Sequence, residues 1–150
     1  MRLALGFPLL LLFFNVCQGG PIDLGKVDQE KPPATDEIRA PKNDEGIATV
    51  GLRESVAATI AKDETKHVYM LVNPISADAT AKKIWWVQRE VAKNGTGAEC
   101  ECQFGEENQG KGEYFAIVAV VTGEKFDVGQ TLDSFPKEGI CSKLRIVKRK

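Results

Sequence analysis

The sequence predicts an α+β fold in which one or two helices pack on a small antiparallel sheet. Residues 68–72 and 114–121 are short apolar runs bounded by turn-forming residues, which is typical of strands. Residues 54–62 and 77–93 are rich in alanine and other helix formers, which favours helices. The alternative is an all-β sandwich or barrel, because the second of these stretches also carries hairpin signals.

The first predicted helix, residues 54–62, depends on the spacing of its apolar side chains. Leu52, Val56 and Ile60 are four residues apart, which places them on one face of a helix. Alanine, which recurs in this stretch, has the highest helix propensity of the amino acids. We therefore expect a short helix here.

The second predicted helix, residues 77–93, has signals at both ends. Ser76 is a residue type that favours the N-cap, and Asn94-Gly95 favours a left-handed helix stop. Asn-Gly is also a strong hairpin signal, and residues 84–91 contain several residue types that favour strands. The alanines and the cap favour the helix over the hairpin.

The second half of the chain predicts strands. Residues 98–104 alternate small or apolar side chains with acidic ones. A glycine-rich polar loop, residues 105–112, separates them from residues 114–121, whose hydrophobicity predicts a central strand. Residues 126–139 predict irregular chain, and residues 141–147 predict a half-buried last strand.

The N-terminal residues have the layout of a secretory signal peptide. A short positive start precedes an apolar run of about a dozen residues, which is shorter than the roughly 20 residues that a membrane-spanning helix needs. Cleavage after Gly19 places small residues, Cys17 and Gly19, at the positions that signal peptidase recognises. We therefore expect a secreted, extracellular protein with a signal peptide over residues 1–19.

The mature chain divides into two parts. Residues 20–46 are rich in proline and charge and contain no aromatic residue, which predicts a flexible arm. Residues 47–150 are long enough for one domain with its own core, and they end in a basic tail. We expect a single globular domain.

Removal of the signal peptide leaves three cysteines, Cys100, Cys102 and Cys141, in a compartment where thiols oxidise. On a strand, Cys100 and Cys102 share one face, so either of them could meet Cys141 on a neighbouring strand. A Cys100–Cys102 bond would close a very tight ring, so we expect a Cys102–Cys141 disulfide with Cys100 as the alternative partner. This bond would contribute about 3–4 kcal/mol. The remaining thiol is buried and inert, or it links two copies in a disulfide-linked homodimer.

The one usable glycosylation sequon is Asn94-Gly95-Thr96. In a secreted chain, an Asn-Gly turn exposes its backbone to the modifying enzyme. We therefore expect a glycan on Asn94.

Catalytic and metal-binding motifs do not occur in the sequence. His67 is the single histidine, and no serine lies in a Gly-x-Ser-x-Gly motif, so a Ser-His-Asp arrangement lacks its partners. We therefore predict no catalytic residues, no metal site and no cofactor. A small secreted hydrolase that depends on His67 is the weakest alternative.

Two features predict contacts with partners. Trp85 and Trp86 are adjacent, so they cannot share a face, and the exposed one would anchor a partner surface. A basic strip at the C-terminus would contact polyanions such as a sulfated polysaccharide. It consists of Lys143, Arg145, Lys148, Arg149 and Lys150.

The net charge of −1 at pH 7 gives no sign of a nucleic-acid partner, and no second long apolar run indicates a membrane partner. Together these features predict a secreted, non-enzymatic binding or inhibitory module that acts through an extracellular protein. The alternative is a disulfide-linked structural or matrix component.

Overall fold

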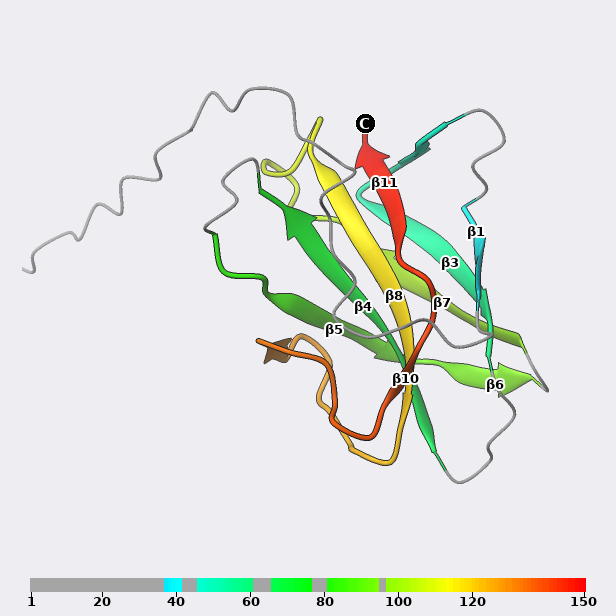
Figure 1. Ribbon diagram of the computed structural model, residues 1–150. Coiled ribbons are helices and arrows are strands. Elements are labelled where there is room, and N and C mark those ends of the chain that lie inside the picture. Colours follow the sequence, from blue (N-terminus) through cyan, green and yellow to red (C-terminus); the bar gives the residue numbers. More distant parts are fainter. Residues whose placement is uncertain (1–36, 42–45, 61–65, 77–80, 95–96) are drawn as a thin grey trace, which may run out of the picture.

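The structure is a computed structural model that describes residues 37–41, 46–60, 66–76, 81–94 and 97–150. The described residues form strands and connecting segments, and none of them belongs to a helix (Figure 1). The predicted α+β fold is therefore wrong, and the all-β alternative is confirmed. No membrane-spanning helix is found among the described residues.

The eleven strands form two sheets. A four-stranded sheet, the small sheet, has the order β1-β3-β7-β6. A seven-stranded sheet, the large sheet, has the order β2-β11-β8-β4-β5-β9, with β10 also paired to β8. The strands are β1 (Glu37–Ala40), β2 (Ala48–Val50), β3 (Arg53–Thr59), β4 (His67–Ile75), β5 (Trp85–Glu90), β6 (Ala92–Asn94), β7 (Gly97–Gln103), β8 (Tyr114–Thr122), β9 (Thr131–Leu132), β10 (Ile140–Cys141) and β11 (Arg145–Arg149).

The strands predicted in both halves of the chain are found in the structure. Residues 68–72 lie in β4, residues 98–103 in β7, and residues 114–121 in β8, which is central in the large sheet. The predicted last strand, residues 141–147, is divided between β10 and β11. Ser142 lies in the gap, where its hydroxyl accepts a hydrogen bond from the Ala119 amide at 3.0 Å. This bond satisfies a donor of β8 that the interrupted strand leaves open.

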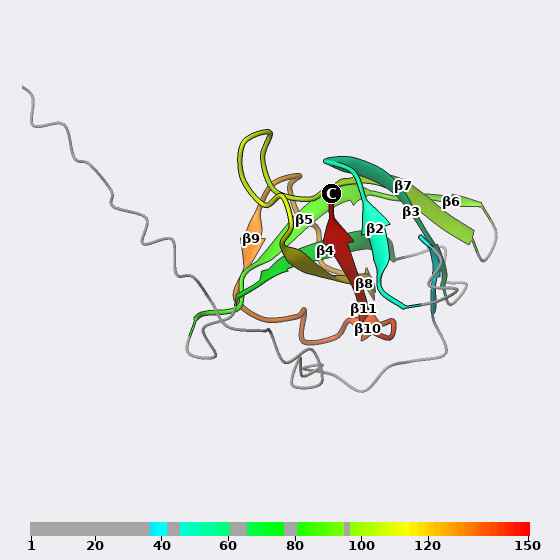
Figure 2. The same cartoon turned by 90° about the horizontal axis from the view of Figure 1, so that it is seen from above.

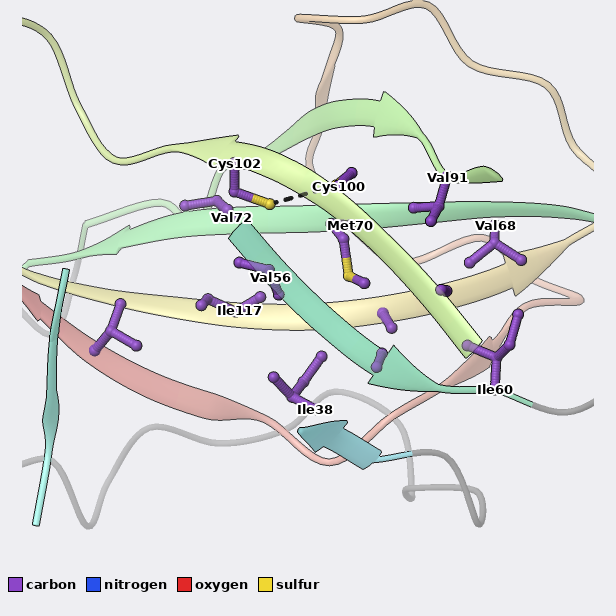
Figure 3. Packing of buried hydrophobic residues seen from close by; sticks show 14 of the residues in the cluster. Ile38, Val56, Ile60, Val68, Met70, Val72, Val91, Cys100, Cys102 and Ile117 are labelled. Atoms are coloured by element: carbon purple, nitrogen blue, oxygen red, sulfur yellow. Dashed lines mark hydrogen bonds between the residues drawn. The ribbon is translucent and has the colours of Figure 1, made fainter. Parts of the chain in front are cut away.

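Each face of the large sheet buries its own core. The inner face packs against the small sheet, and Figure 3 shows the side chains of this inner core between the sheets. The outer face packs under residues 123–144, which carry β9 and β10. Viewed from above, β3 and β7 lie on one side of β4 and β8, and the orange chain of residues 123–144 passes along the other (Figure 2).

The predicted helix at residues 54–62 is wrong in its described part, which forms β3, and residues 61–62 lie outside the described residues. Val56 and Ala58 are buried, and the flanking Ile60 is buried too, so the burial pattern has a period of two. Side chains on a strand alternate between its two faces, so residues four apart lie on the same face. The same apolar positions therefore fit a strand as well as a helix. Pairing with β1 on one side and β7 on the other outweighs the helix propensity of alanine.

The predicted helix at residues 77–93 is also wrong in its described part. Residues 77–80 lie outside the described residues, and the chain that follows forms β5 and β6. β6 pairs antiparallel with β7, with Asn94 opposite Gly97, so the competing hairpin interpretation is confirmed. Tertiary pairing of β5 with β4 outweighs the alanine and cap signals.

The domain includes chain that the sequence assigns to the arm. β1 lies within residues 20–46, and its Ile38 is 1 % exposed in the inner core. The domain therefore begins no later than Glu37. The predicted signal peptide and most of the predicted arm lie outside the described residues.

Candidate functional site

A pocket of about 580 Å³ lies at one end of the space between the two sheets. Strand β5 and the end of β7 form two of its sides, and residues 104–113 form a third. Its volume falls within the range of about 300–1,000 Å³ that is usual for ligand sites.

The floor of the pocket is the part of the inner face of the large sheet that the small sheet does not cover. Val72 lies directly opposite Trp86 in the β4–β5 pairing, and Pro74 lies opposite Phe115 in the β4–β8 pairing. Val72 and Phe115 also belong to the inner core. The pocket is therefore a continuation of that core, opened to solvent where β7 ends.

Strand alternation separates the two tryptophans. Trp85 points into the outer core, is 1 % exposed and packs against Phe135 with 4.8 Å between ring centroids. Trp86 lies on the opposite face in the pocket wall and is 45 % exposed. Three large hydrophobic residues are exposed among the described residues, and two of them, Trp86 and Val128, line this pocket.

The rim formed by residues 104–113 is held by Arg149. This residue is 5 % exposed, and its Nη1 donates hydrogen bonds to the carbonyl oxygens of Glu106 and Gln109. Gly105 and Gly110 have φ values of 78° and 90°, a left-handed conformation that favours glycine. A Cβ on Gly105 would lie 2.7 Å from the Gln109 carbonyl oxygen, so a side chain there would displace the loop.

A glutamine connects β5 to β7 across the pocket. The Gln88 side-chain oxygen accepts a hydrogen bond from the backbone N–H of Gln103 at 2.8 Å. Gln88 Nε2 donates to the Trp86 carbonyl oxygen at 3.4 Å. The first bond joins β5 to β7 beside Trp86, and the second holds the Gln88 side chain against its own strand.

Charged side chains of both signs surround the opening. Arg53 and Glu101 form an exposed ion pair at 3.8 Å. The remaining charged lining residues are Arg89, Glu106 and Glu113. An apolar floor with a polar rim is the usual anatomy of a surface that contacts a partner.

Two buried thiols stand beside the pocket. Cys100 and Cys102 point from β7 into the inner core, and their sulfur atoms are 3.6 Å apart. The hydrogen bond with Cys102 lowers the pKa of Cys100, burial opposes this change, and the Arg89 backbone N–H and charge lower it further. The contact with Cys100 and burial both raise the pKa of Cys102.

The structure does not bring the predicted Cys102–Cys141 pair together. Cys102 lies in the inner core, whereas Cys141 lies in the outer core, on the other face of the large sheet. The same separation applies to Cys100, the alternative partner. All three cysteines are buried thiols.

The predicted basic strip is divided by strand alternation. Lys143, Lys148 and Lys150 are exposed, and Lys148 Nζ lies 5.3 Å from the centroid of the Tyr114 ring. Arg149 is buried in the rim, and Arg145 is half-buried, donating to the Ile38 carbonyl oxygen at 2.7 Å. The two arginines therefore form hydrogen bonds within the domain, and polyanion binding stays a prediction for the lysines.

The other predicted residues lie away from the pocket lining. His67 Nδ1 lies 2.6 Å from Glu90 Oε1, and among the described residues this is the only hydrogen bond of the His67 side chain. Asn94 is the last residue of β6, and the rest of its sequon lies outside the described residues.

Sequence reasoning found Trp86 and the glycine-rich loop but not the rest of the pocket. Val72, Phe115 and Gln88 carry no local signal, because strand pairing brings them together. In the sequence, Arg149 is interpreted as part of a basic tail, because five cationic residues occur within the last eight positions. The glycines of residues 105–112 are the one local pattern in the sequence that indicates a loop of defined shape.

Comparison with known proteins gives no match to this chain among family models, curated proteins or solved structures.

Proposed function

We propose that this protein is a secreted, non-enzymatic binding module and that a segment of an extracellular partner protein docks in the pocket beside Trp86. The observation that carries the proposal is the convergence of two exposed large hydrophobic residues, Trp86 and Val128, on one preformed pocket. Exposed apolar clusters with a polar rim mark interaction sites, and tryptophan is enriched among residues that dominate binding energy.

The rigidity of the pocket supports this function. Arg149 holds the rim, and Gln88 connects β5, the strand that carries Trp86, to β7. A preformed site loses little conformational entropy when a partner binds. The partner therefore meets an aromatic anchor that is already in place.

The burial of all three thiols argues against the alternative of a cross-linked matrix component. Cys100, Cys102 and Cys141 are each 8 % exposed or less. A disulfide between two folded copies requires sulfurs at the surface of both, whereas these three sulfurs lie below it. We therefore expect a monomer on non-reducing electrophoresis of the secreted protein.

Retention of partners by matched variants tests the proposed docking site. The wild-type chain, Trp86→Ala and Ile47→Ala are immobilised separately and incubated with the extracellular fluid of the source organism. Ile47 is the matched control, because it is also exposed, at 38 %, but does not line the pocket.

We expect a protein that is retained by the wild type and by Ile47→Ala but is about 30-fold weaker on Trp86→Ala. That ratio corresponds to a contact of about 2 kcal/mol. Equal retention on all three surfaces would contradict the proposed site. Circular dichroism of each variant confirms that the fold is intact.

A further inference from the structure

We propose that Cys100 and Cys102 form a thiol–disulfide exchange site, in which a small-molecule disulfide such as glutathione disulfide oxidises the pair to a Cys100–Cys102 disulfide within β7. The proposal is independent of the docking function. It rests on the placement of the two sulfur atoms, shown by the dashed line in Figure 3.

The two sulfurs are close and face the same way. They lie 3.6 Å apart in the inner core, on two residues that share one face of β7. A disulfide bond is about 2.0 Å long, so the sulfurs need to approach by about 1.5 Å. Closing the bond therefore requires side-chain rotation and a local contraction of β7 between its ladders with β3 and β6.

No other cysteine among the described residues competes for either sulfur. Cys141 belongs to the outer core, and the large sheet separates it from Cys100 and Cys102. The pairing expected from the sequence is therefore blocked by the fold. The tight ring between Cys100 and Cys102 becomes the disulfide that the native fold can close.

The pocket brings an oxidant to the pair. Cys102 forms part of the pocket wall, and Cys100 retains 8 % exposure. The exchange requires a small disulfide in the pocket to displace neighbouring side chains, because Cys102 is 0 % exposed and Cys100 does not line the pocket.

The surroundings favour Cys100 as the thiol that attacks first. The Cys102 thiol and the Arg89 backbone N–H stabilise a Cys100 thiolate, which lowers its pKa. A thiolate is the nucleophile in disulfide exchange. Cys102 keeps its proton until the second step, because its pKa is raised.

The exchange balances in two steps. The Cys100 thiolate attacks one sulfur of the small disulfide, forms a mixed disulfide and releases one small thiolate. Cys102 then loses its proton to solvent or to that thiolate, and its sulfur attacks the Cys100 sulfur. The second small thiolate leaves. The pair has lost two electrons and two protons, and the oxidant has become two thiols.

Peptide mapping of the full chain tests the proposal, because trypsin separates the cysteines favourably. Cleavage after Lys93 and Lys111 leaves Cys100 and Cys102 in one peptide, residues 94–111, whereas Cys141 lies in residues 138–143. The native protein is equilibrated in glutathione buffers of increasing disulfide content, denatured in the presence of the alkylating agent, deglycosylated and digested. Circular dichroism before alkylation confirms that the fold persists.

We expect residues 94–111 to lose two hydrogen atoms and to escape alkylation, while Cys141 is alkylated. Cys141→Ser should give the same product, and Cys100→Ser should not give it. Two results would overturn the proposal. One is that Cys100 and Cys102 stay reduced in a buffer that contains glutathione disulfide and no reduced glutathione. The other is a disulfide cross-link between the peptides 94–111 and 138–143.

Discussion

The two faces of the large sheet are covered in different ways. On the inner face, the small sheet provides a regular cover, and its contact residues are small or aliphatic, such as Val56, Ala58 and Ile38. On the outer face, residues 123–144 provide an irregular cover with only two short strands, β9 and β10.

The irregular cover depends on aromatic anchors. Trp85 packs against Phe135, and Tyr69 packs edge-on against Phe126 with 5.3 Å between ring centroids. The Tyr69 hydroxyl also accepts a hydrogen bond from the Phe126 amide at 3.0 Å. Aromatic rings bury a large area for each side chain, so a few of them can hold a segment whose ladder is limited to the short strands β9 and β10.

The difference shows how the same sheet can present a rigid site and a looser cover. In the inner cover, β3 and β7 pair with each other at seven positions. The small sheet ends before it covers Trp86, and the uncovered area is the pocket. The outer cover is held at separate points. We therefore expect residues 123–144 to open at a lower free energy than the strands beneath them.

The largest expected effects come from a matched pair of phenylalanines, one on each face. Phe104 is 0 % exposed in the inner core, and Phe135 is 5 % exposed in the outer core. Phe104→Ala should destabilise by about 4–5 kcal/mol and Phe135→Ala by about 3 kcal/mol, because an irregular cover collapses more readily into the cavity. Urea unfolding measures both values, and equal losses would remove the proposed difference between the covers.

The next effect concerns the rim of the pocket. Arg149→Ala removes the donor that serves the carbonyl oxygens of Glu106 and Gln109, and we expect a loss of about 3 kcal/mol. Lys148→Ala is the control, since it loses only an exposed cation–π contact of about 0.5 kcal/mol. Urea unfolding of the two variants measures the difference. Similar small losses would show that the rim does not depend on Arg149.

A smaller effect is expected at the outer cover. Tyr69→Phe removes the acceptor of the Phe126 amide and should cost about 1 kcal/mol. Hydrogen exchange at Phe126 should accelerate, while exchange in β8 stays slow. Tyr114→Phe serves as the control and should leave both unchanged. An unaltered Phe126 exchange rate in Tyr69→Phe would argue against this anchor.

The smallest effect is expected at an ion pair on the outer cover. Lys82 Nζ lies 2.7 Å from Asp133 Oδ2, but both side chains are about two-thirds exposed, at 67 % and 66 %. Lys82→Ala should therefore change stability by about 0.5 kcal/mol or less, and added salt should reduce the difference further. A change above about 1 kcal/mol would mean that this contact helps to hold the cover.

The strand predictions succeeded where the burial pattern is local. Both faces of the large sheet are covered, so the central residues of β4 and β8, 68–72 and 115–121, are apolar on both faces. The helix predictions failed where the signal has two solutions. Apolar residues four apart fit a helix or a strand, and Asn94-Gly95 fits a helix stop or a hairpin. Pairing partners distant in the sequence select the strand in each case.

Adjacent residues such as Trp85 and Trp86 take opposite faces of a strand, and Cys100 and Cys102 share one face, so both relations can be derived from the sequence. The sequence does not show that Trp86 is the exposed tryptophan or that Cys141 lies beyond the reach of the other two cysteines. Both outcomes depend on which face of the large sheet each residue occupies. That choice is made by strand pairing and by the extent of the covering sheet, and neither is encoded in a local pattern.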